Sequence, residues 1–218
     1  NNFINFEKKM KILITGAAGF IGYSFSNHLL KNKKIKVIGI DNLNNYYDPK
    51  IKRSRLRLLK KNKNFKFLKT DICNKKKVDQ IFKKNKFDFV FHFAAQAGVR
   101  YSIRYPRKYL DANINGFYNI LESSNKNNIK RLFYASSSSV YGENKNYPLN
   151  EKERILPKNM YALSKKINEE ISSIYNNYYK LKLTGLRFFT VYGEWGRPDM
   201  MMLQFISSFY NKKEFKLF

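Results

Sequence analysis

The sequence has 218 residues, 43% of them hydrophobic, which suits one domain with a sizeable core, or one domain and part of another. The formal net charge is +27, but lysines are scattered through every segment, which favours solvated lysine faces over a nucleic-acid site. The single cysteine, Cys73, excludes an intramolecular disulfide and fits a reducing compartment, for which we expect the cytoplasm, and no apolar stretch is long enough to span a membrane.

Both ends of the chain carry features that stand apart from a domain. Residues 1–10, NNFINFEKKM, form a predicted N-terminal extension without the apolar core of a signal peptide. The sequence does not begin with methionine, which makes Met10 a candidate natural start. Residues 216–218 resemble the beginning of a new strand, so we expect the chain to be a truncated fragment.

The most informative stretch is residues 11–41. An apolar run over 11–15 predicts a buried strand, a helix with apolar residues at helical intervals follows, and residues 36–40 predict a second strand. Between the first strand and the helix stand three glycines, Gly16, Gly19 and Gly22, with GxxGxxG spacing. The second strand ends at Asp41.

This order of strand, glycine turn, helix, strand and acid predicts a dinucleotide site. Gly16 permits the tight turn, Gly19 lets backbone N–H groups approach a pyrophosphate at a helix N-terminus, and Gly22 lets the helix pack closely on the strand. Asp41 is placed to bind the hydroxyls of the adenosine ribose and would repel a 2′-phosphate. We therefore expect NAD rather than NADP, although a glycine-rich turn of another α/β protein is the alternative interpretation.

Strands and helices alternate along the rest of the chain. After a polar insertion, residues 50–61 predict a basic helix, which we interpret as a solvated surface helix. Residues 87–95 (FDFVFHFAA) form a continuous apolar run, typical of a strand that is buried on both faces. The other predicted strands are 65–70, 132–136 and 183–191, and the other predicted helices lie around 78–82, from Pro106 to about Leu121, and over 158–179.

This alternation predicts a doubly wound parallel α/β sheet of the Rossmann type. We assign residues 11–193 to the dinucleotide-binding domain and residues 194–218 to the start of an incomplete substrate-binding part. Ligands of such sheets bind at the carboxyl ends of the strands. The candidate site residues therefore lie in 16–22, 94–100, 136–139 and 190–197, together with Asp41 and Asp71.

Tyr161 and Lys165 form a Tyr-x-x-x-Lys pair on one face of a predicted helix. A nearby ammonium lowers the pKa of a phenol, which would let Tyr161 act as a general base. The spacing alone carries little information because it recurs at Tyr46, Tyr141 and Tyr178. Tyr161 is selected by its context, since its helix follows a strand that ends in four serines, residues 136–139.

We interpret His28 and His92 as structural, and no cluster of ligands suggests a metal.

Five segments together resemble the extended short-chain dehydrogenase/reductase family: GAAGFIG, FAAQAGVRYS, YASSSSVYG, YALSK and LRFFTVYGEWGRPDM. Within this family the chain resembles the nucleotide-sugar epimerases, most of all the UDP-glucuronate 4-epimerases. Glu194 stands where the family would lead us to expect proline. By this resemblance we also expect a homodimer and a role in polysaccharide biosynthesis.

The resemblance implies roles for individual positions. Tyr161 would be the base, Lys165 would hold the nicotinamide ribose, and Ser137 would bind the reacting hydroxyl. The residues expected to bind the cofactor are Gly16, Gly19, Phe20, Ile21, Gly22, Asp41, Asn42, Asp71, Ile72, Phe93, Ala94, Ala95, Tyr161, Lys165 and Phe188. The residues expected around the sugar are Arg100, Ser138, Ser139, Thr190 and Arg197, with Arg197 set against a carboxylate.

The activity implied by the resemblance is NAD-dependent 4-epimerisation of a UDP-sugar, UDP-glucuronate to UDP-galacturonate, through a 4-keto intermediate. A UDP-glucose 4-epimerase and a UDP-glucuronate decarboxylase are the alternatives among enzymes. A 4,6-dehydratase would resemble this chain but carries an Asp-Glu pair where Ser138 and Ser139 stand. A binding protein that senses NAD without turnover is the alternative from another class, and the retained Tyr161, Lys165 and Ser137 argue against it.

Overall fold

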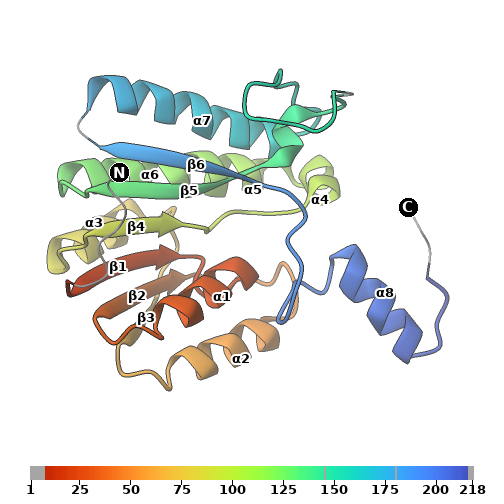
Figure 1. The fold of residues 1–218 in the computed structure, drawn as a ribbon, viewed down its shortest axis with the longest axis horizontal. Helices are drawn as coiled ribbons and strands as arrows, with labels where there is room; N and C mark the ends of the chain where they lie inside the picture. Colours follow the sequence, from red (N-terminus) through yellow and green to blue (C-terminus); the bar gives the residue numbers. More distant parts are fainter. Residues whose placement is uncertain (1–7, 145, 180, 216–218) are drawn as a thin grey trace.

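The computed structural model describes residues 8–144, 146–179 and 181–215. Within these residues six parallel strands form one sheet in the order β3-β2-β1-β4-β5-β6 (Figure 1). The strands are β1 (Met10–Thr15), β2 (Ile35–Asp41), β3 (Phe65–Lys69), β4 (Phe89–His92), β5 (Arg131–Ser137) and β6 (Lys182–Phe188). The order reverses between β1 and β4, which is where a doubly wound sheet opens a ligand crevice. The predicted fold class is confirmed.

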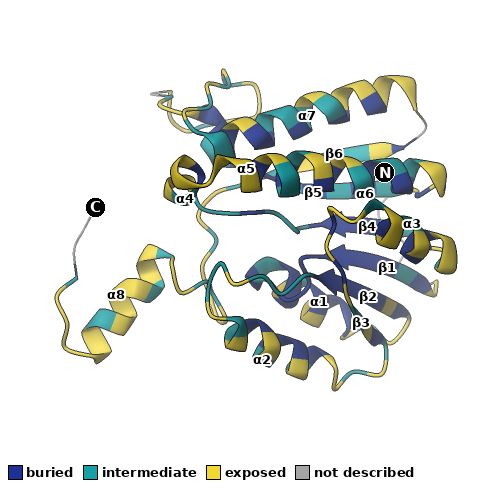
Figure 2. Cartoon of the chain, turned by 180° about the vertical axis from the view of Figure 1, so that it is seen from behind, coloured by how far each residue is buried: buried dark blue, intermediate teal, exposed yellow. Residues whose placement is uncertain are grey.

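Helices cover both faces of the sheet. On one face α1 (Phe20–Leu29) packs against β1, β2 and α2 (Pro49–Leu59). The opposite face, seen in Figure 2, is covered by α3 (Lys75–Lys84), α6 (Gly116–Lys126) and α7 (Met160–Tyr178). Each face has its own cluster of buried apolar side chains, because alternate residues of a strand point to opposite sides.

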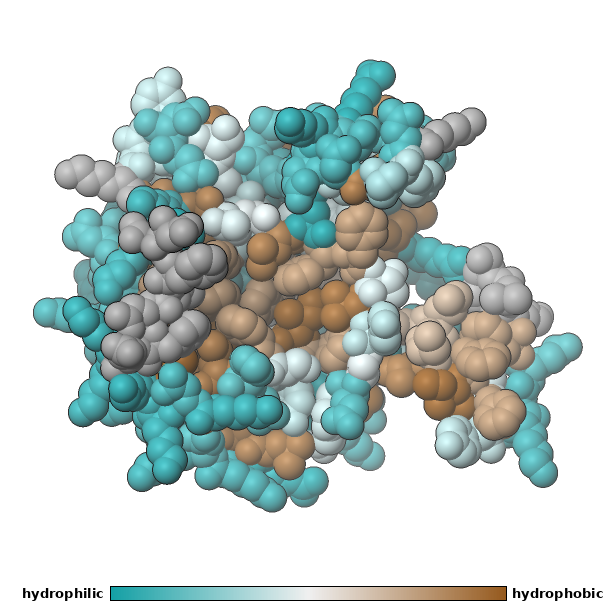
Figure 3. All heavy atoms as spheres, viewed as in Figure 1, coloured by the Kyte–Doolittle hydropathy of each residue, from teal (hydrophilic) through white to brown (hydrophobic). Residues whose placement is uncertain are grey.

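The two faces are not equally covered. Phe91 stacks on Phe133 with ring centres 4.8 Å apart, yet Phe133 and Phe89 are only half-buried. Hydrophobic residues gather over the middle of this face in Figure 3. The predicted strand over 87–95 is therefore wrong in two respects, since β4 spans only Phe89–His92 and is not buried along its whole length on both faces. Residues 93–98 leave the sheet as a loop, which brings their backbone to the crevice.

The stretch that follows Pro106 is helical but is not one regular α-helix. It consists of α5 (Pro106–Tyr109), a π-helical segment (Leu110–Asn115) and α6. The π segment points the Asn113 side chain inward, where it bonds the backbone of Gln96 and the hydroxyl of Ser164. It therefore braces the loop after β4 against α7.

Three short helical elements have no counterpart among the predictions. These are α4 (Val99–Arg104), a 3₁₀ turn (Ser138–Tyr141) and α8 (Met201–Tyr210). Helix α8 projects away from the sheet in Figure 1 and is mostly exposed in Figure 2. The strand expected at residues 216–218 lies outside the described residues, as do residues 1–7, whereas Met10 already belongs to β1.

Candidate active site

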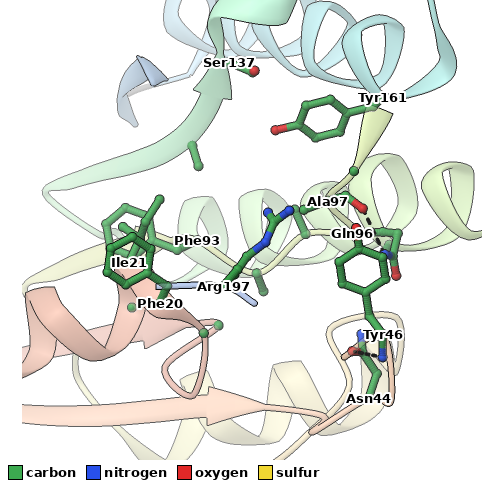
Figure 4. A pocket seen from close by; sticks show the side chains of 18 of the residues that line it. Phe20, Ile21, Asn44, Tyr46, Phe93, Gln96, Ala97, Ser137, Tyr161 and Arg197 are labelled. Carbon is green, nitrogen blue, oxygen red and sulfur yellow. Dashed lines mark hydrogen bonds between the residues drawn. The ribbon is translucent and has the colours of Figure 1, made fainter. Parts of the chain in front are cut away.

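A cavity of about 620 Å³ opens at the carboxyl ends of the strands (Figure 4). It extends from the glycine turn after β1 to the loops that follow β4, β5 and β6. Parallel strands present all of these loops at one edge, so residues far apart in the sequence line one hollow.

The glycine turn is shaped by close backbone contacts. Gly16 has a φ of +70°, and a Cβ added there would lie 2.7 Å from the backbone nitrogen of Ala94. A Cβ on Gly22 would lie 2.1 Å from the carbonyl oxygen of Gly16. Helix α1 begins directly after Gly19, which has no side chain to cap the free N–H groups of the first turn. Such a turn leaves room and donors for a pyrophosphate.

Asp41 lies at the end of β2, buried beside this turn. Its carboxylate accepts hydrogen bonds from the backbone N–H of Ala18 (3.1 Å) and of Leu43 (2.8 Å). Burial raises the pKa of Asp41, while these two bonds and the charge of Lys52 oppose the rise. Next along the cavity, Asn42 donates to the carboxylate of Asp71 at 3.0 Å. The acid and its neighbour therefore line the cavity where the sequence placed an adenosine ribose.

Helix α2 does not behave as the solvated surface helix that we expected. Lys52 is 5% exposed and Arg55 is fully buried. The ammonium of Lys52 bonds the side-chain oxygen of Asn44 at 2.7 Å and lines the cavity. The expectation was wrong because these two residues share the inward helical face with Leu56 and Leu59, at i, i+3, i+4 and i+7.

The predicted catalytic residues come together. Ser137 ends β5, Tyr161 lies in the first turn of α7, and all three of Ser137, Tyr161 and Lys165 line the cavity. The Asn159 side chain caps α7 by accepting from the N–H of Ala162 at 2.9 Å. In Figure 4 the Tyr161 phenol points into the cavity, below Ser137.

The groups that lower the pKa of Tyr161 differ from the sequence-based expectation, which named Lys165. Burial raises the pKa of Tyr161, whereas the nearby Ser137 hydroxyl and the charge of Arg197 lower it. Lys165 is not among the groups that oppose the rise. Its ammonium donates to the carbonyl of Ala135 at 2.7 Å and lies 5.9 Å from the centre of the Tyr161 ring, and burial lowers the pKa of Lys165 to about 8.

A half-buried ion pair lies close to the end of β5, between β6 and α7. Arg187 on β6 binds both carboxylate oxygens of Glu169 on α7, at 3.0 and 2.8 Å. Ser136 on β5 donates to the same carboxylate at 2.5 Å. The Glu169 carboxylate on α7 therefore links this helix to both β5 and β6.

Arg197 points into the middle of the cavity in Figure 4 but already has an acidic partner. Its Nε and Nη2 donate to the two oxygens of Asp199, at 3.0 and 2.7 Å. The Tyr46 hydroxyl donates to the same carboxylate at 2.9 Å, and the guanidinium lies over the Tyr46 ring. One edge of Arg197 is thus occupied by its own loop.

The structure brings together every predicted cofactor residue and all but one of the predicted sugar residues. Arg100 is the exception, because it lies exposed on α4 and is not among the residues that line the cavity. Lining residues that sequence reasoning missed include Tyr46, Lys52 and Tyr101. Tyr46 and Lys52 stood in segments that we had interpreted only as an insertion and a surface helix.

Two kinds of feature were not found among the described residues. Within residues 8–144, 146–179 and 181–215, no group of three or more His, Cys, Asp or Glu side chains could hold a metal ion. In the same ranges, no helix combines the length and the apolar character needed to cross a bilayer.

The chain matches known proteins over nearly its whole length. The sequence model of the NAD dependent epimerase/dehydratase family matches residues 12–218. Protein CapI of Staphylococcus aureus is 48% identical over 93% of this chain and 60% of its own length. UDP-glucuronate 4-epimerase 4 of Arabidopsis thaliana is 46% identical over 95% of this chain and 47% of its own length. The chain thus spans about half to two thirds of the curated relatives that it matches.

Solved structures give the same likeness. The UDP-glucuronic acid 4-epimerase from Bacillus cereus, in complex with UDP-glucuronic acid and NAD, matches with a TM-score of 0.90 and 33% identity, over 96% of this chain and 66% of that one. The UDP-glucose 4-epimerase from Thermotoga maritima, with UDP-glucose, matches with a TM-score of 0.87 and 32% identity, over 96% and 66%.

Proposed function

The chain belongs to the NAD-dependent epimerase/dehydratase family, and from this premise we propose that the intact protein converts UDP-glucuronate to UDP-galacturonate by epimerisation at sugar carbon 4. One observation supports the proposal most: a glycine turn shaped for a dinucleotide, the Ser137–Tyr161–Lys165 group and an inward-pointing arginine line a single cavity. The UDP-glucuronate 4-epimerases among the relatives add to it.

The cavity fits NAD, the cofactor of the family. A side chain at Gly16 or Gly22 would collide with backbone, so the turn is kept open at the place where a pyrophosphate binds. Asp41 and Asp71 would hold the adenosine end, and Phe93 and Phe188 line the path between the two ends of the cofactor. When bound, NAD would supply a reversible oxidation at the carbon of a secondary alcohol.

Tyr161 is the base in this proposal. Its phenol oxygen would take the proton of the 4-hydroxyl, with Ser137 hydrogen-bonding both groups. Ser137 and Arg197 are the two groups that lower the pKa of Tyr161 against the effect of burial, so both favour the phenolate that would accept this proton. The Lys165 ammonium donates a hydrogen bond to the carbonyl of Ala135, which fixes its position in the lining of the cavity.

Arg197 would read the sugar carboxylate. Burial of a carboxylate demands a cationic partner, and a guanidinium offers a planar set of donors. Asp199 occupies the Nε and Nη2 edge of Arg197. A sugar carboxylate would therefore bind Nη1 or displace Asp199. Ser138, Ser139 and Thr190 line the adjoining wall and would bind the sugar hydroxyls.

The ion pair between Arg197 and Asp199 also favours a second candidate, a UDP-glucose 4-epimerase. A guanidinium that is already neutralised attracts a carboxylate less than a free one does. The Thermotoga maritima enzyme, solved with UDP-glucose, matches this chain almost as well. A decarboxylase remains the third candidate, because it would also require an arginine for the carboxylate.

Incubation of the intact protein with UDP-glucuronate, followed by identification of the product, tests the proposal. Formation of UDP-galacturonate with no loss of carbon dioxide is the expected result. Release of a pentose nucleotide would establish the decarboxylase instead, and turnover of UDP-glucose alone would establish the second candidate. No turnover of any of these sugars, with NAD bound, would leave the binding protein as the function.

Calorimetry with NAD and NADP tests the cofactor. NAD should bind more tightly, because Asp41 would repel a 2′-phosphate, and Asp41→Ala should narrow the difference. Asp71→Asn is the matched control, since it removes a carboxylate that lies farther along the same wall. Equal or tighter binding of NADP by the wild type would contradict the assignment of Asp41.

A further inference from the structure

Arg55 is a buried cation that the proposed reaction does not use. It is fully buried in the middle of α2, although arginine is rarely buried without an acidic partner. Among the described residues no carboxylate forms a salt bridge with it, and its Nε has no hydrogen-bond partner. An unsatisfied buried donor is costly, so the remaining contacts of the guanidinium should matter.

Those contacts join two parts of the site that are far apart in the sequence. Nη1 donates to the carbonyl of Ala18, inside the glycine turn, at 3.0 Å. Nη2 donates to the carbonyls of Trp195 and Gly196, at 2.5 and 3.1 Å. These two carbonyls directly precede Arg197. The two ends of one planar group thus hold the cofactor turn on one side and the arginine loop on the other.

The loop on the Nη2 side is held in a conformation that it would not adopt by itself. Trp195 has a φ of +63°, which is unfavourable for a bulky residue and persists where the surroundings fix it. Its ring packs edge-on against Tyr23 of α1 at 5.8 Å, although 39% of the residue is exposed. A Cβ on the next residue, Gly196, would lie 2.8 Å from a side-chain carbon of Leu203 and 3.1 Å from the carbonyl oxygen of Gly193.

We propose that Arg55 is a positioning residue that ties the glycine turn, through Ala18, to the loop of Trp195 and Gly196, so that the placement of Arg197 depends on the state of the cofactor turn. The hydrogen bonds of Arg55 to Ala18, Trp195 and Gly196 support this link. Only the identity of the ligand that Arg197 binds rests on the proposed function.

A lysine at this position could not replace the tie. The ammonium is a single point on a flexible stem, whereas the guanidinium reaches the carbonyl of Ala18 with one nitrogen and those of Trp195 and Gly196 with another. Arg55→Lys therefore keeps the buried positive charge and loses the bridge. Arg55→Gln loses both. Arg57→Gln is the matched control, because Arg57 lies two residues along the same helix and is exposed.

The single tryptophan of this sequence gives a direct readout, since it is Trp195 itself. The fluorescence anisotropy of Trp195 is measured in the intact protein, with Trp195→Phe as the blank for any other emission. We expect the anisotropy to fall by roughly a third in Arg55→Lys and Arg55→Gln, because the freed loop moves on the nanosecond scale. Saturating NAD should change the signal of the wild type and of Arg57→Gln but not that of either Arg55 variant.

A kinetic cycle locates the effect at Arg197. Arg55→Lys should lower kcat/KM for UDP-glucuronate by about 10- to 100-fold in the wild type and by less than about three-fold in the Arg197→Ala background. Additive losses in the two backgrounds, or an unchanged anisotropy, would overturn the proposal. So would the loss of the native circular dichroism spectrum in both Arg55 variants, because Arg55 would then serve folding alone. A wild type inactive on UDP-glucuronate would refute the proposed function while the anisotropy still tests Arg55.

Discussion

The two ends of the cavity are built in different ways. At the proposed cofactor end the shape comes largely from backbone, since the turn leaves no room for a side chain at Gly16 or Gly22. At the end proposed to hold the sugar, the shape comes from side chains on loops, where Arg197, Asp199 and Tyr46 hold one another and Phe189 is largely exposed. A backbone-built end is rigid and recognises what all dinucleotides share, whereas a loop-built end can be altered residue by residue to suit different sugars.

The largest effect should come from Tyr161→Phe. Tyr161 lies between the two ends of the cavity, and this substitution removes only its phenol oxygen. We expect epimerisation to fall by about 10²- to 10⁴-fold, because that is the usual cost of losing a general base. The measurement is kcat for the preferred sugar, with NAD affinity measured alongside.

NAD affinity should stay unchanged in Tyr161→Phe, which would show that NAD binding does not depend on the phenol oxygen. Tyr141, which lies close to the same strand end and bonds Arg187, is the control position for Tyr→Phe. Activity within a few-fold of the wild type in Tyr161→Phe would mean that another residue is the base.

The next effect should be confined to the sugar end. Arg197→Ala should lower kcat/KM for UDP-glucuronate by about 30-fold to several thousand-fold, since removing one partner of a buried charge pair costs roughly 2–5 kcal/mol. The loss on UDP-glucose should be far smaller, because no carboxylate is left unpaired. Steady-state kinetics with both sugars measure the difference.

Asp199→Asn sharpens the same test, since it frees the edge of Arg197 that the loop now occupies. It should leave NAD binding unchanged and favour UDP-glucuronate over UDP-glucose. Equal losses on both sugars in Arg197→Ala would assign Arg197 to holding its loop rather than to reading the sugar.

A third change should act first at the cofactor end. Gly22→Ala places a methyl group 2.1 Å from the carbonyl oxygen of Gly16, so the turn must shift. Overpacking of this severity costs about 3 kcal/mol, which predicts roughly 100-fold weaker NAD binding by calorimetry. Gly19→Ala is the control, because its nearest contact is 3.1 Å and should cost much less. Equal affinities in the two variants would show that the turn is not rigid.

The smallest effect concerns pH and the core beneath the cofactor end. Burial and the charge of Lys165 lower the pKa of His92 from 6.5 to about 3. The unfolded chain therefore binds this proton first as the pH falls, so the free energy of unfolding should drop by roughly 1–2 kcal/mol between about pH 6.5 and about pH 5. Urea unfolding at several pH values measures the drop. His92→Asn should reduce the drop, whereas His28→Gln, at the exposed histidine, should not.

The same difference between the two ends explains what the sequence could predict. The strands, the turn at Gly16–Gly22 and Asp41 follow from local patterns, because backbone constraints act between near neighbours in the chain. The pairing of Arg197 with Asp199 and Tyr46 joins residues up to 153 apart, and no local pattern encodes it. Arg55 was missed for a different reason, since its helical position matched the buried leucines while its charge suggested solvent.

The π-helical segment between α5 and α6 has a consequence for insertions and deletions. Each residue of an α-helix turns the chain by about 100°, so the extra residue of a π turn shifts the phase of one half-helix against the other. In this phase Tyr109 and Phe117, on either side of the segment, are both fully buried. Deletion of one residue from Leu110–Asn115 would give a more regular helix, yet it would rotate Tyr109 off the carbonyls of Ala97 and Gly98 that it now binds. The contacts of Tyr109 therefore constrain the number of residues in this segment.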